Sequence, residues 1–262
     1  MERAKALGCS TIQIFSHNPR QWAVNKIPTD IISKFKELRN AYDMTPVYVH
    51  TSYLINLAAS SKEVLEKSIE LLILEMDLAD SLGADYVVLH TGSASNDTGP
   101  EARKKAIEAL NSITSGKTWK AGLLLENTAG ERGDISSRME DLGEIIKNIT
   151  GNLIAGVCID TCHAFAAGYD LTGKDGLSGL AGEIETHIGL DKVKAIHLND
   201  SKKGCASHVD RHEHIGEGLI GKEGLGDFIN HPAFMNIPLI LETPKKTEDD
   251  DPRNLKVVRS LF

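Results

Sequence analysis

The sequence predicts an α/β protein built as a TIM (β/α)8-type barrel, and three observations carry this prediction. Short, nearly continuous apolar stretches alternate with longer amphipathic ones, which is typical of parallel strands covered by helices on both faces. Seven such strand–helix units fit within 262 residues, a length that suits one barrel better than an open sheet. No linker or low-complexity tract divides the chain, so we expect a single barrel domain over residues 1–262.

The predicted strands are apolar runs of five to seven residues bounded by turn-forming or polar residues. Because these runs are apolar at nearly every position rather than at alternate ones, they indicate strands that are buried on both faces. Seven strands are expected, at 11–15, 46–50, 85–90, 122–126, 156–160, 193–199 and 238–242.

The clearest predicted helix opens at Ser60 and ends at Gly83. Glu63 follows Ser60 by three residues in a capping-box pattern, and apolar residues recur at spacings of three and four from Leu65 to Ala79. Further helices are expected at 29–41, 100–114, 139–149, 180–188, 223–230 and 251–262.

The beginning of the chain, ERAKALG, has the pattern of the last turns of a helix closed by Gly8. No strand precedes it, so we expect the first β-strand of the barrel to be missing from this sequence, which leaves seven β/α units. Either the native start lies upstream, or the protein uses an incomplete barrel and must cover two strand edges.

Composition excludes several classes of protein. No apolar run approaches the roughly 18 residues of a membrane span, and the N-terminus lacks a signal-peptide pattern, so a cytoplasmic protein is expected. The four cysteines lack paired CxxC spacing, which argues against a disulfide framework or a zinc ribbon. A net charge of −8 argues against simple attraction to nucleic acid, unless acidic residues hold divalent cations that offset it.

Six consecutive predicted strands each carry one metal-type side chain at or near the C-terminal end, where α/β barrels build their active sites. A convergent ring of imidazoles and carboxylates would repel or stay unsatisfied without a cation between them. The residues are His50, His90, Glu126, Asp160, His197 and Glu242.

Three further candidate ligands lie nearby in the sequence. His163 follows in DTCH, and Asp210 and His212 stand in HVDRHEHIGEG, residues 208–218. Nine ligands are too many for one ion and suit two or three, with Zn²⁺ or Mn²⁺ favoured by this mixture of groups. Clustered metals of this kind are used to hydrolyse phosphate esters.

Seven segments carry a resemblance to a known family. They run in order across nearly the whole chain and are rich in rarer residues: NPRQW (18–22), HTSYLINLA (50–58), LLENTAG (124–130), GVCIDTCHAFAAGYD (156–170), HLNDSK (197–202), HVDRHEHIGEG (208–218) and PLILETP (238–244). The chain thereby resembles the endonuclease IV family, zinc-dependent apurinic/apyrimidinic (AP) endonucleases built on a TIM barrel with a trinuclear zinc site.

The resemblance implies a role for each candidate ligand. One zinc would be held by His50, His90 and Glu126, a second by Glu126 with Asp160, His197 and Glu242, and a third by His163, Asp210 and His212. Glu126, shared by two ions, would be the catalytic residue that orients the attacking hydroxide. Mn²⁺ or Fe²⁺ are possible substitutes for zinc.

The implied reaction is hydrolysis of the phosphodiester 5′ to an abasic site in duplex DNA, leaving a 3′-hydroxyl and a 5′-deoxyribose phosphate. Removal of blocked 3′ ends is expected from the same site. The implied partner is damaged double-stranded DNA rather than a membrane, and the protein is expected to be a monomer, associated with the nucleoid when bound to DNA.

Different residues would recognise the lesion. The resemblance implies that Arg20, Tyr53 and Leu54 enter the gap left by a flipped-out nucleotide, although core packing is an alternative for Tyr53 and Leu54. Lys202 and Arg211 are candidate phosphate contacts, and a solvated basic turn is an alternative for Lys202.

Two other functions fit parts of the pattern. A metal-dependent sugar isomerase or epimerase of the same barrel superfamily also places Glu, Asp and His at strand ends, but it needs only one or two ions. A protein that binds abasic DNA without cutting it would result if the missing strand deformed the site. His208 and His214 have no assigned role, and His17, His187 and His231 are expected at surface or capping positions.

Overall fold

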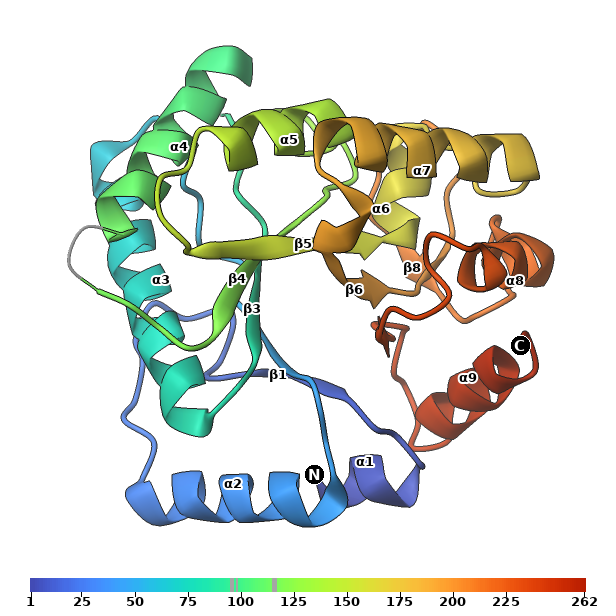
Figure 1. The fold of residues 1–262 in the computed structure, drawn as a ribbon, viewed down its shortest axis with the longest axis horizontal. Helices are drawn as coiled ribbons and strands as arrows, with labels where there is room; N and C mark the ends of the chain where they lie inside the picture. Colours follow the sequence, from blue (N-terminus) through green and yellow to red (C-terminus); the bar gives the residue numbers. More distant parts are fainter. Residues whose placement is uncertain (95–96, 98, 115–116) are drawn as a thin grey trace. The chain divides into compact units, whose positions relative to one another are not determined.

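The computed structural model of the chain describes residues 1–94, 97, 99–114 and 117–262. It divides into two compact units, Met1–Glu126 with Ile145–Gly156, and Asn127–Glu144 with Val157–Phe262. Strands and helices alternate along the chain in both units (Figure 1). The alternation agrees with the pattern of apolar and amphipathic stretches in the sequence.

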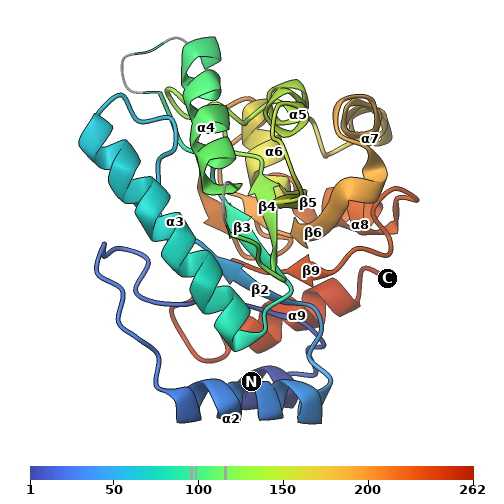
Figure 2. The same cartoon turned by 60° about the vertical axis from the view of Figure 1, so that its left-hand side comes forward.

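The first unit contains four complete parallel strands in the order β1-β2-β3-β4, so that strands consecutive in the chain are neighbours in the sheet. Figure 2 shows α3 and α4 of this unit lying side by side outside the strands. The elements are α1 (Glu2–Ala6), β1 (Ile12–Phe15), α2 (Thr29–Tyr42), β2 (Val47–His50), α3 (Lys62–Leu82), β3 (Tyr86–Leu89), α4 (Gly99–Thr114) and β4 (Gly122–Glu126).

The second unit continues the same alternation. Its parallel strands have the order β5-β6-β9, and β7 pairs with β8 in a short antiparallel ribbon. Both α5 and β5 span a boundary between the units in the chain. The elements are α5 (Met139–Lys147), β5 (Ile154–Asp160), α6 (Thr161–Ala167), α7 (Lys174–His187), a 3-10 turn (Leu190–Lys192), β6 (Val193–His197), β7 (Asp200–Ser201), β8 (His212–Glu213), α8 (Gly221–Asn230), β9 (Leu239–Ile240) and α9 (Asp250–Arg259).

The strands form the core because they are apolar on both faces. Every residue of β2 is buried, as are the last four of β4 and the last five of β5. Each fully buried aliphatic side chain stabilises the fold by about 1.5–3 kcal/mol relative to exposure. The helices contribute one face each, and α3 buries Leu72, Met76 and Ala79 completely. Continuous burial confirms the prediction of two-sided strands for β2, β4 and β5, whereas no residue of β1 is buried.

All seven predicted strands are present, but some boundaries differ from the prediction. Strand β9 has only two residues because Glu242 N donates to the side-chain oxygen of Asn199 at 2.8 Å instead of continuing a strand ladder. Helix α7 begins at Lys174 rather than at 180. Gly176 and Gly179 weaken the helical pattern of its first turns, which is why the prediction started too late.

The start of α3 also differs by one cap position. The N-cap is Ser61, whose Oγ accepts from Val64 N at 3.4 Å, whereas Ser60 Oγ donates to Asp97 at 2.9 Å. The predicted capping box at Ser60 is therefore wrong, while the predicted end at Gly83 is confirmed by its left-handed backbone (φ 71°). Among the described residues, no helix combines the length and the apolar character needed to cross a membrane.

Candidate metal centre

The C-terminal ends of three neighbouring strands bring together three ligand-type side chains of the first unit. His50 ends β2, Glu126 ends β4, and His90 follows β3 directly. Glu126 Oε2 lies 3.2 Å from His50 Nε2 and 3.1 Å from His90 Nε2. His50 and Glu126 are buried, and the three ligand atoms lie within 4.8 Å of one another.

The other nitrogen of His50 fixes which atom of its ring can bind a cation. Nδ1 lies 2.8 Å from the carbonyl oxygen of Thr51, and a carbonyl oxygen only accepts, so Nδ1 carries a hydrogen. In the neutral ring the Nε2 lone pair then faces the Glu126 carboxylate, and two electron-rich groups repel each other unless a cation lies between them. The arrangement therefore fits a metal ion whose histidine ligand is oriented by a backbone carbonyl.

A second group of ligand-type side chains lies at the ends of β5, β6 and β9 in the second unit. His197 Nδ1 is 3.2 Å from Glu242 Oε2 and 3.9 Å from Asp160 Oδ2. Asn199 links both carboxylate residues, because its Nδ2 donates to Asp160 Oδ2 at 2.6 Å and its Oδ1 accepts from Glu242 N at 2.8 Å. The buried Asn199 amide thus sets the position of two acidic groups that converge on one imidazole.

The third group consists of His163, Asp210 and His212. The Asp210 carboxylate lies 3.3 Å from His163 Nε2 and 3.2 Å from His212 Nε2. The Nδ1 atoms of the two rings donate to the carbonyl oxygens of Asn127 and Glu242, each at 2.9 Å. When the two rings are neutral, their Nε2 lone pairs face a carboxylate, so this group has the same fit to a cation as the first.

Electrostatics in the third group favour positive charge. Burial opposes ionisation of Asp210, but its hydrogen bonds with His163 and His212 outweigh burial and hold its pKa far below the usual range. Burial alone would lower the pKa of His212, whereas the charge of Asp160 and the bond to Asp210 raise it to about 9. The group therefore attracts a positive charge, either as protons or as a metal ion.

His163 is positioned by a short helix that was not expected from the sequence. Helix α6 starts directly after β5, and Asp160, its N-cap, accepts from His163 N at 2.8 Å. Asn127 in turn makes two bonds to the Asp160 backbone, at 2.8 and 3.1 Å. One residue thus ends a strand, caps a helix and offers a ligand oxygen, so Asp160 and His163 have fixed relative positions.

The loop 208–218, HVDRHEHIGEG, is held in shape by Asp200, which the sequence analysis did not single out. The buried Asp200 carboxylate accepts four backbone N–H groups from the far end of the loop and beyond, at 2.9–3.2 Å. Gly216 adopts φ 77°, and a side chain on Gly218 would collide with Asp200. Together with the β7–β8 ribbon, these bonds place Asp210 and His212 beside His163.

The two histidines without an assigned role contact the loop's surroundings. His214 Nδ1 accepts from Asn254 Nδ2 at 3.0 Å, and Asn254 Oδ1 accepts from Ile215 N at 2.9 Å. His208 N donates to Ala166 O at 3.0 Å, and its ring leaves no room for a side chain on Gly130. Neither belongs to a group of three metal-type side chains in the part of the chain that the structure describes.

The candidate DNA-contact residues of the first unit lie on two loops. Tyr53 is 57% exposed, which excludes core packing for this residue, and Leu54 is half-buried. Arg20 is exposed on the loop after β1. The loop of Tyr53 is joined to that of Arg20 by a bond from Tyr53 N to Pro19 O at 3.1 Å.

The candidate phosphate contacts of the second unit differ in their surroundings. Arg211 is exposed and donates to the carbonyl oxygen of Asp210 at 2.8 Å. Lys202 Nζ lies 3.5 Å from Glu213 Oε2, so a phosphate would compete with the Glu213 carboxylate for the Lys202 ammonium group.

The expectation that His17 is a surface or capping residue is wrong. Its side chain is 7% exposed, and its Nε2 lies 2.5 Å from Glu75 Oε1 of α3. No local pattern in the sequence indicates this pair, because His17 and Glu75 lie 58 residues apart in the chain. His187 is exposed and His231 caps α8, as expected.

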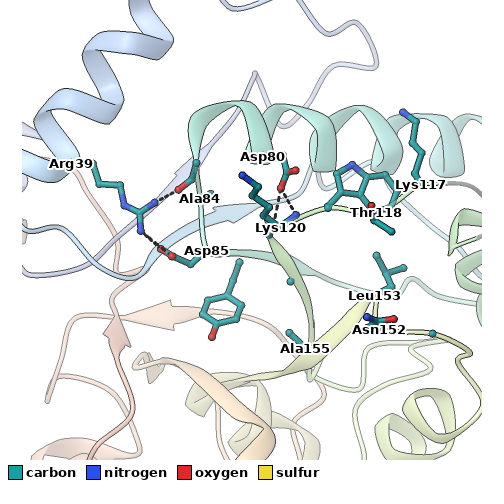
Figure 3. A pocket seen from close by; sticks show the side chains of 16 residues that line it. Arg39, Asp80, Ala84, Asp85, Lys117, Thr118, Lys120, Asn152, Leu153 and Ala155 are labelled. Carbon is teal, nitrogen blue, oxygen red and sulfur yellow. Dashed lines mark hydrogen bonds and ion pairs between the residues drawn. The ribbon is translucent and has the colours of Figure 1, made fainter.

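A separate hollow of about 660 Å³ lies in the first unit (Figure 3). It is lined by residues at the starts of β3, β4 and β5, among them Tyr86, Gly122 and Ala155, opposite to the strand ends that carry His50 and Glu126. Its acidic groups already have partners, since Asp85 accepts from Arg39 and Asp80 accepts from backbone N–H groups of Lys120 and Ala121. This hollow is therefore not the metal centre.

The chain is similar to known proteins over nearly its full length. Residues 1–261 match the family described as xylose isomerase-like TIM barrel. The chain is 45% identical to the probable endonuclease 4 of Halothermothrix orenii, covering 93% of this chain and 88% of that protein. It is 39% identical to the probable endonuclease 4 of Aquifex aeolicus, covering 100% of this chain and 92% of that protein.

Solved structures are also similar to this chain over nearly its full length. The crystal structure of endonuclease IV from Thermus thermophilus matches with a TM-score of 0.86 and 37% identity, over 99% of this chain and 91% of that one. A D-tagatose 3-epimerase-like protein matches with a TM-score of 0.75 and 20% identity, over 100% of this chain and 91% of that one. The second likeness shows a shared fold alone.

Proposed function

Because the chain belongs to the endonuclease IV family, on a xylose isomerase-like TIM barrel, we propose that it is a DNA-repair endonuclease that cuts duplex DNA at abasic sites. The membership confirms both the fold class and the family resemblance expected from the sequence. In the proposed reaction the phosphodiester 5′ to the lesion is hydrolysed, which leaves a 3′-hydroxyl and a 5′-deoxyribose phosphate. The same site would remove blocking groups from damaged 3′ ends.

The observation that carries the proposal is that imidazole nitrogens face carboxylates in groups fit to hold cations. We propose three Zn²⁺ ions, with Mn²⁺ or Fe²⁺ as substitutes, and nine ligands: His50, His90, Glu126, Asp160, His163, His197, Asp210, His212 and Glu242. When bound, such ions supply hydroxide at neutral pH and stabilise the charge of the phosphate oxygens. Metal charge would also offset the net charge of −8 near the DNA.

The residues themselves contribute orientation. Glu126 is fully buried between two imidazoles and is the proposed catalytic residue, which would orient the attacking hydroxide. The carbonyl oxygens bonded to His50, His163 and His212 hold each ring in one tautomer. Such fixed groups need little reorganisation during the reaction.

DNA recognition is assigned to residues of the loops, most of which are exposed. Arg20, Tyr53 and Leu54 would fill the space left by the displaced nucleotide, and exposure of Tyr53 supports this role. Arg211 and Lys202 would contact phosphates. Acting on DNA, the enzyme would work in the cytoplasm at the nucleoid.

The third group of ligands argues against the sugar isomerase alternative. An isomerase on the same fold needs one or two ions around a small polyol, whereas His163, Asp210 and His212 form an additional complete group. The structural likeness to an epimerase-like protein extends to the fold and does not account for this group.

The test is a nicking assay with a duplex that carries one abasic-site analogue and is labelled at the 5′ end. The zinc-loaded protein should cut 5′ to the lesion, and Glu126→Gln should lower the rate by at least about 100-fold because it removes a buried anionic group at the reacting centre. His231→Gln, which changes a helix cap, serves as the matched control and should retain activity. Tight binding without a nick would instead support a protein that binds abasic DNA without cutting it. If the protein neither cuts nor binds the duplex, isomerisation of ketoses would be the next activity to assay.

A further inference from the structure

A buried carboxylate in α3 connects two loops of the first unit. Glu75 is 1% exposed, although carboxylates are rarely buried without partners. Its two oxygens accept from Ser52 N at 3.0 and 3.1 Å, and Oε1 lies 2.5 Å from His17 Nε2. Ser52 lies just after β2 and His17 just after β1, so one side chain contacts both loops.

The same two loops are joined to each other near their exposed residues. Ser52 Oγ donates to Pro19 O at 2.8 Å, and Tyr53 N donates to the same oxygen at 3.1 Å. Within the second loop, Leu54 N donates to Ser52 Oγ at 3.2 Å. Glu75 therefore lies beneath a bonded pair of loops, 16–22 and 51–57, which carry the three residues assigned to lesion recognition.

The polar character of Glu75 is not needed to fill the core. Burial raises the pKa of this carboxyl, and the bonds to His17 and Ser52 act against that shift. An apolar side chain of similar size would occupy the space without the desolvation cost of an anion. What an apolar side chain could not supply is a fixed direction for Ser52 N and the His17 ring.

We propose that Glu75 is a positioning residue that holds the loops of Arg20 and of Tyr53 and Leu54 in one arrangement for binding DNA. This inference rests on the proposed function. Tyr53 is 57% exposed, and its ring lies beside Phe15 and His50 with centroids 5.4 and 5.9 Å away, so the loop backbone that positions Tyr53 also determines where its ring would meet DNA. Loops fixed before binding lose less conformational entropy when DNA binds, which strengthens binding without new contacts.

The first experiment separates loop positioning from the metal centre by using two substrates. The abasic duplex needs both the loops and the metals, whereas bis(p-nitrophenyl) phosphate is a small diester that needs the metals alone. We expect Glu75→Ala to raise KM for the duplex by roughly 10-fold or more, with kcat/KM for the small diester unchanged within about 2-fold. Glu75→Gln, which keeps an acceptor for Ser52 N and a polar contact for His17, should restore most of the affinity for the duplex.

Glu70→Ala is the matched control, since it makes the same change at an exposed position of the same helix and should alter neither substrate. Equal losses on both substrates in Glu75→Ala would overturn the proposal, because they would show damage to the metal centre or to the fold.

The second experiment measures the loops directly and does not depend on catalysis. Amide hydrogen exchange should become faster in 16–22 and 51–57 of Glu75→Ala, while β3 and β4 stay protected. If Glu75→Ala does not fold, His17→Ala removes one partner of Glu75 and should speed exchange in 16–22. Unchanged exchange in these segments would overturn the proposal. A wild-type protein that hydrolyses the small diester and leaves abasic DNA intact would refute the proposed function, and the exchange data would still decide the role of Glu75.

Discussion

At the scale of single residues, the candidate metal centre depends on polar groups that are not ligands. Backbone carbonyls fix the rings of His50, His163 and His212, and the Asn199 amide fixes Asp160 and Glu242. Such supporting bonds determine where the ligand atoms stand before an ion arrives. The strength of metal binding should therefore respond to residues that never touch the metal.

Asn199→Ala provides a direct measure of this effect. The substitution removes the bonds to Asp160 Oδ2 and Glu242 N, so we expect metal affinity to fall by about 10- to 100-fold. Competition with a chelating indicator would measure it. Asn230→Ala, a change at an exposed position outside the ligand groups, should leave affinity as it is, and equal affinities in the two variants would contradict the role given to Asn199.

Asp77 gives a prediction for pH dependence. Burial opposes its ionisation, but hydrogen bonds from Lys117 and Trp119, at 2.7 and 2.8 Å, prevail and lower its pKa. A carboxyl with a lowered pKa in the fold stabilises the protein above its unfolded pKa, near 4, and the contribution is lost as the pH falls below that value.

As the pH falls from about 5 to about 3, the free energy of unfolding should therefore decrease less in Asp77→Asn than in the wild type. The difference should be a few tenths of a kcal/mol, because the Asp77–Lys117 pair is partly exposed. Urea unfolding of metal-free protein at each pH is the measurement. Asp30→Asn, at an exposed position of α2, should follow the wild-type curve. A parallel curve for Asp77→Asn would show that Asp77 contributes nothing to the acid sensitivity.

The positions of the candidate ligands at strand ends could be predicted from the sequence, whereas the groups that support them could not. His50, Glu126 and Asp160 stand at the ends of apolar runs, a position that is visible without a structure. Asn199 and Asp200 are ordinary polar residues in the sequence, and their burial and bonds depend on chain segments tens of residues away. Long-range hydrogen bonds of this kind leave no local pattern.

At the scale of the elements, strand ends are determined by polar groups as much as by apolar runs. Strand β5 ends at Asp160 because that residue becomes the N-cap of α6, and β9 ends early because the Asn199 side chain replaces a strand partner. Apolar patterns therefore predicted which strands exist and where β5 ends, but they missed the early end of β9. Helix α6 escaped prediction because seven residues are too few to show helical periodicity.

The start of α3 offers a test at this scale. Ser61 caps the helix by accepting a hydrogen bond of 3.4 Å from Val64 N. Because this hydrogen bond is long, we expect Ser61→Ala to lower the free energy of unfolding by about 0.5–1 kcal/mol, near the lower end of the values for N-cap residues. Equilibrium unfolding in urea would measure the loss. Ser60→Ala should cost less, because Ser60 bonds to Asp97 outside the helix, and the reverse order would place the cap at Ser60 after all.

At the scale of the whole molecule, metal binding and stability are linked. Buried carboxylates such as those of Glu126 and Asp160 are stabilised by a cation beside them, so the folded state gains from any cation that the candidate ligand groups hold. An ion present at about 1,000 times its dissociation constant adds roughly 4 kcal/mol to the stability of the folded state. For a chain of this size such a gain corresponds to about 8–16 °C in Tm.

Removal of metal by a chelator should therefore lower Tm by about 10 °C or more and abolish nicking, and added Zn²⁺ should restore both. Differential scanning calorimetry and the nicking assay would follow the two effects. The variant His163→Ala with His212→Ala should lose part of the shift, because one ligand group is removed. If the protein is shown to contain zinc and its Tm does not change when the chelator is added, the ions contribute nothing to the stability of the folded state.

The division of the chain into two units also has a consequence for biosynthesis. His50, His90 and Glu126 belong to the first unit, which is complete at Gly156, and the other six candidate ligands all come later, beginning with Asp160. On the ribosome, one ligand group is therefore finished before the first residue of the remaining two has been translated. Metal uptake by the nascent polypeptide would then occur in an order set by the reading direction of the gene.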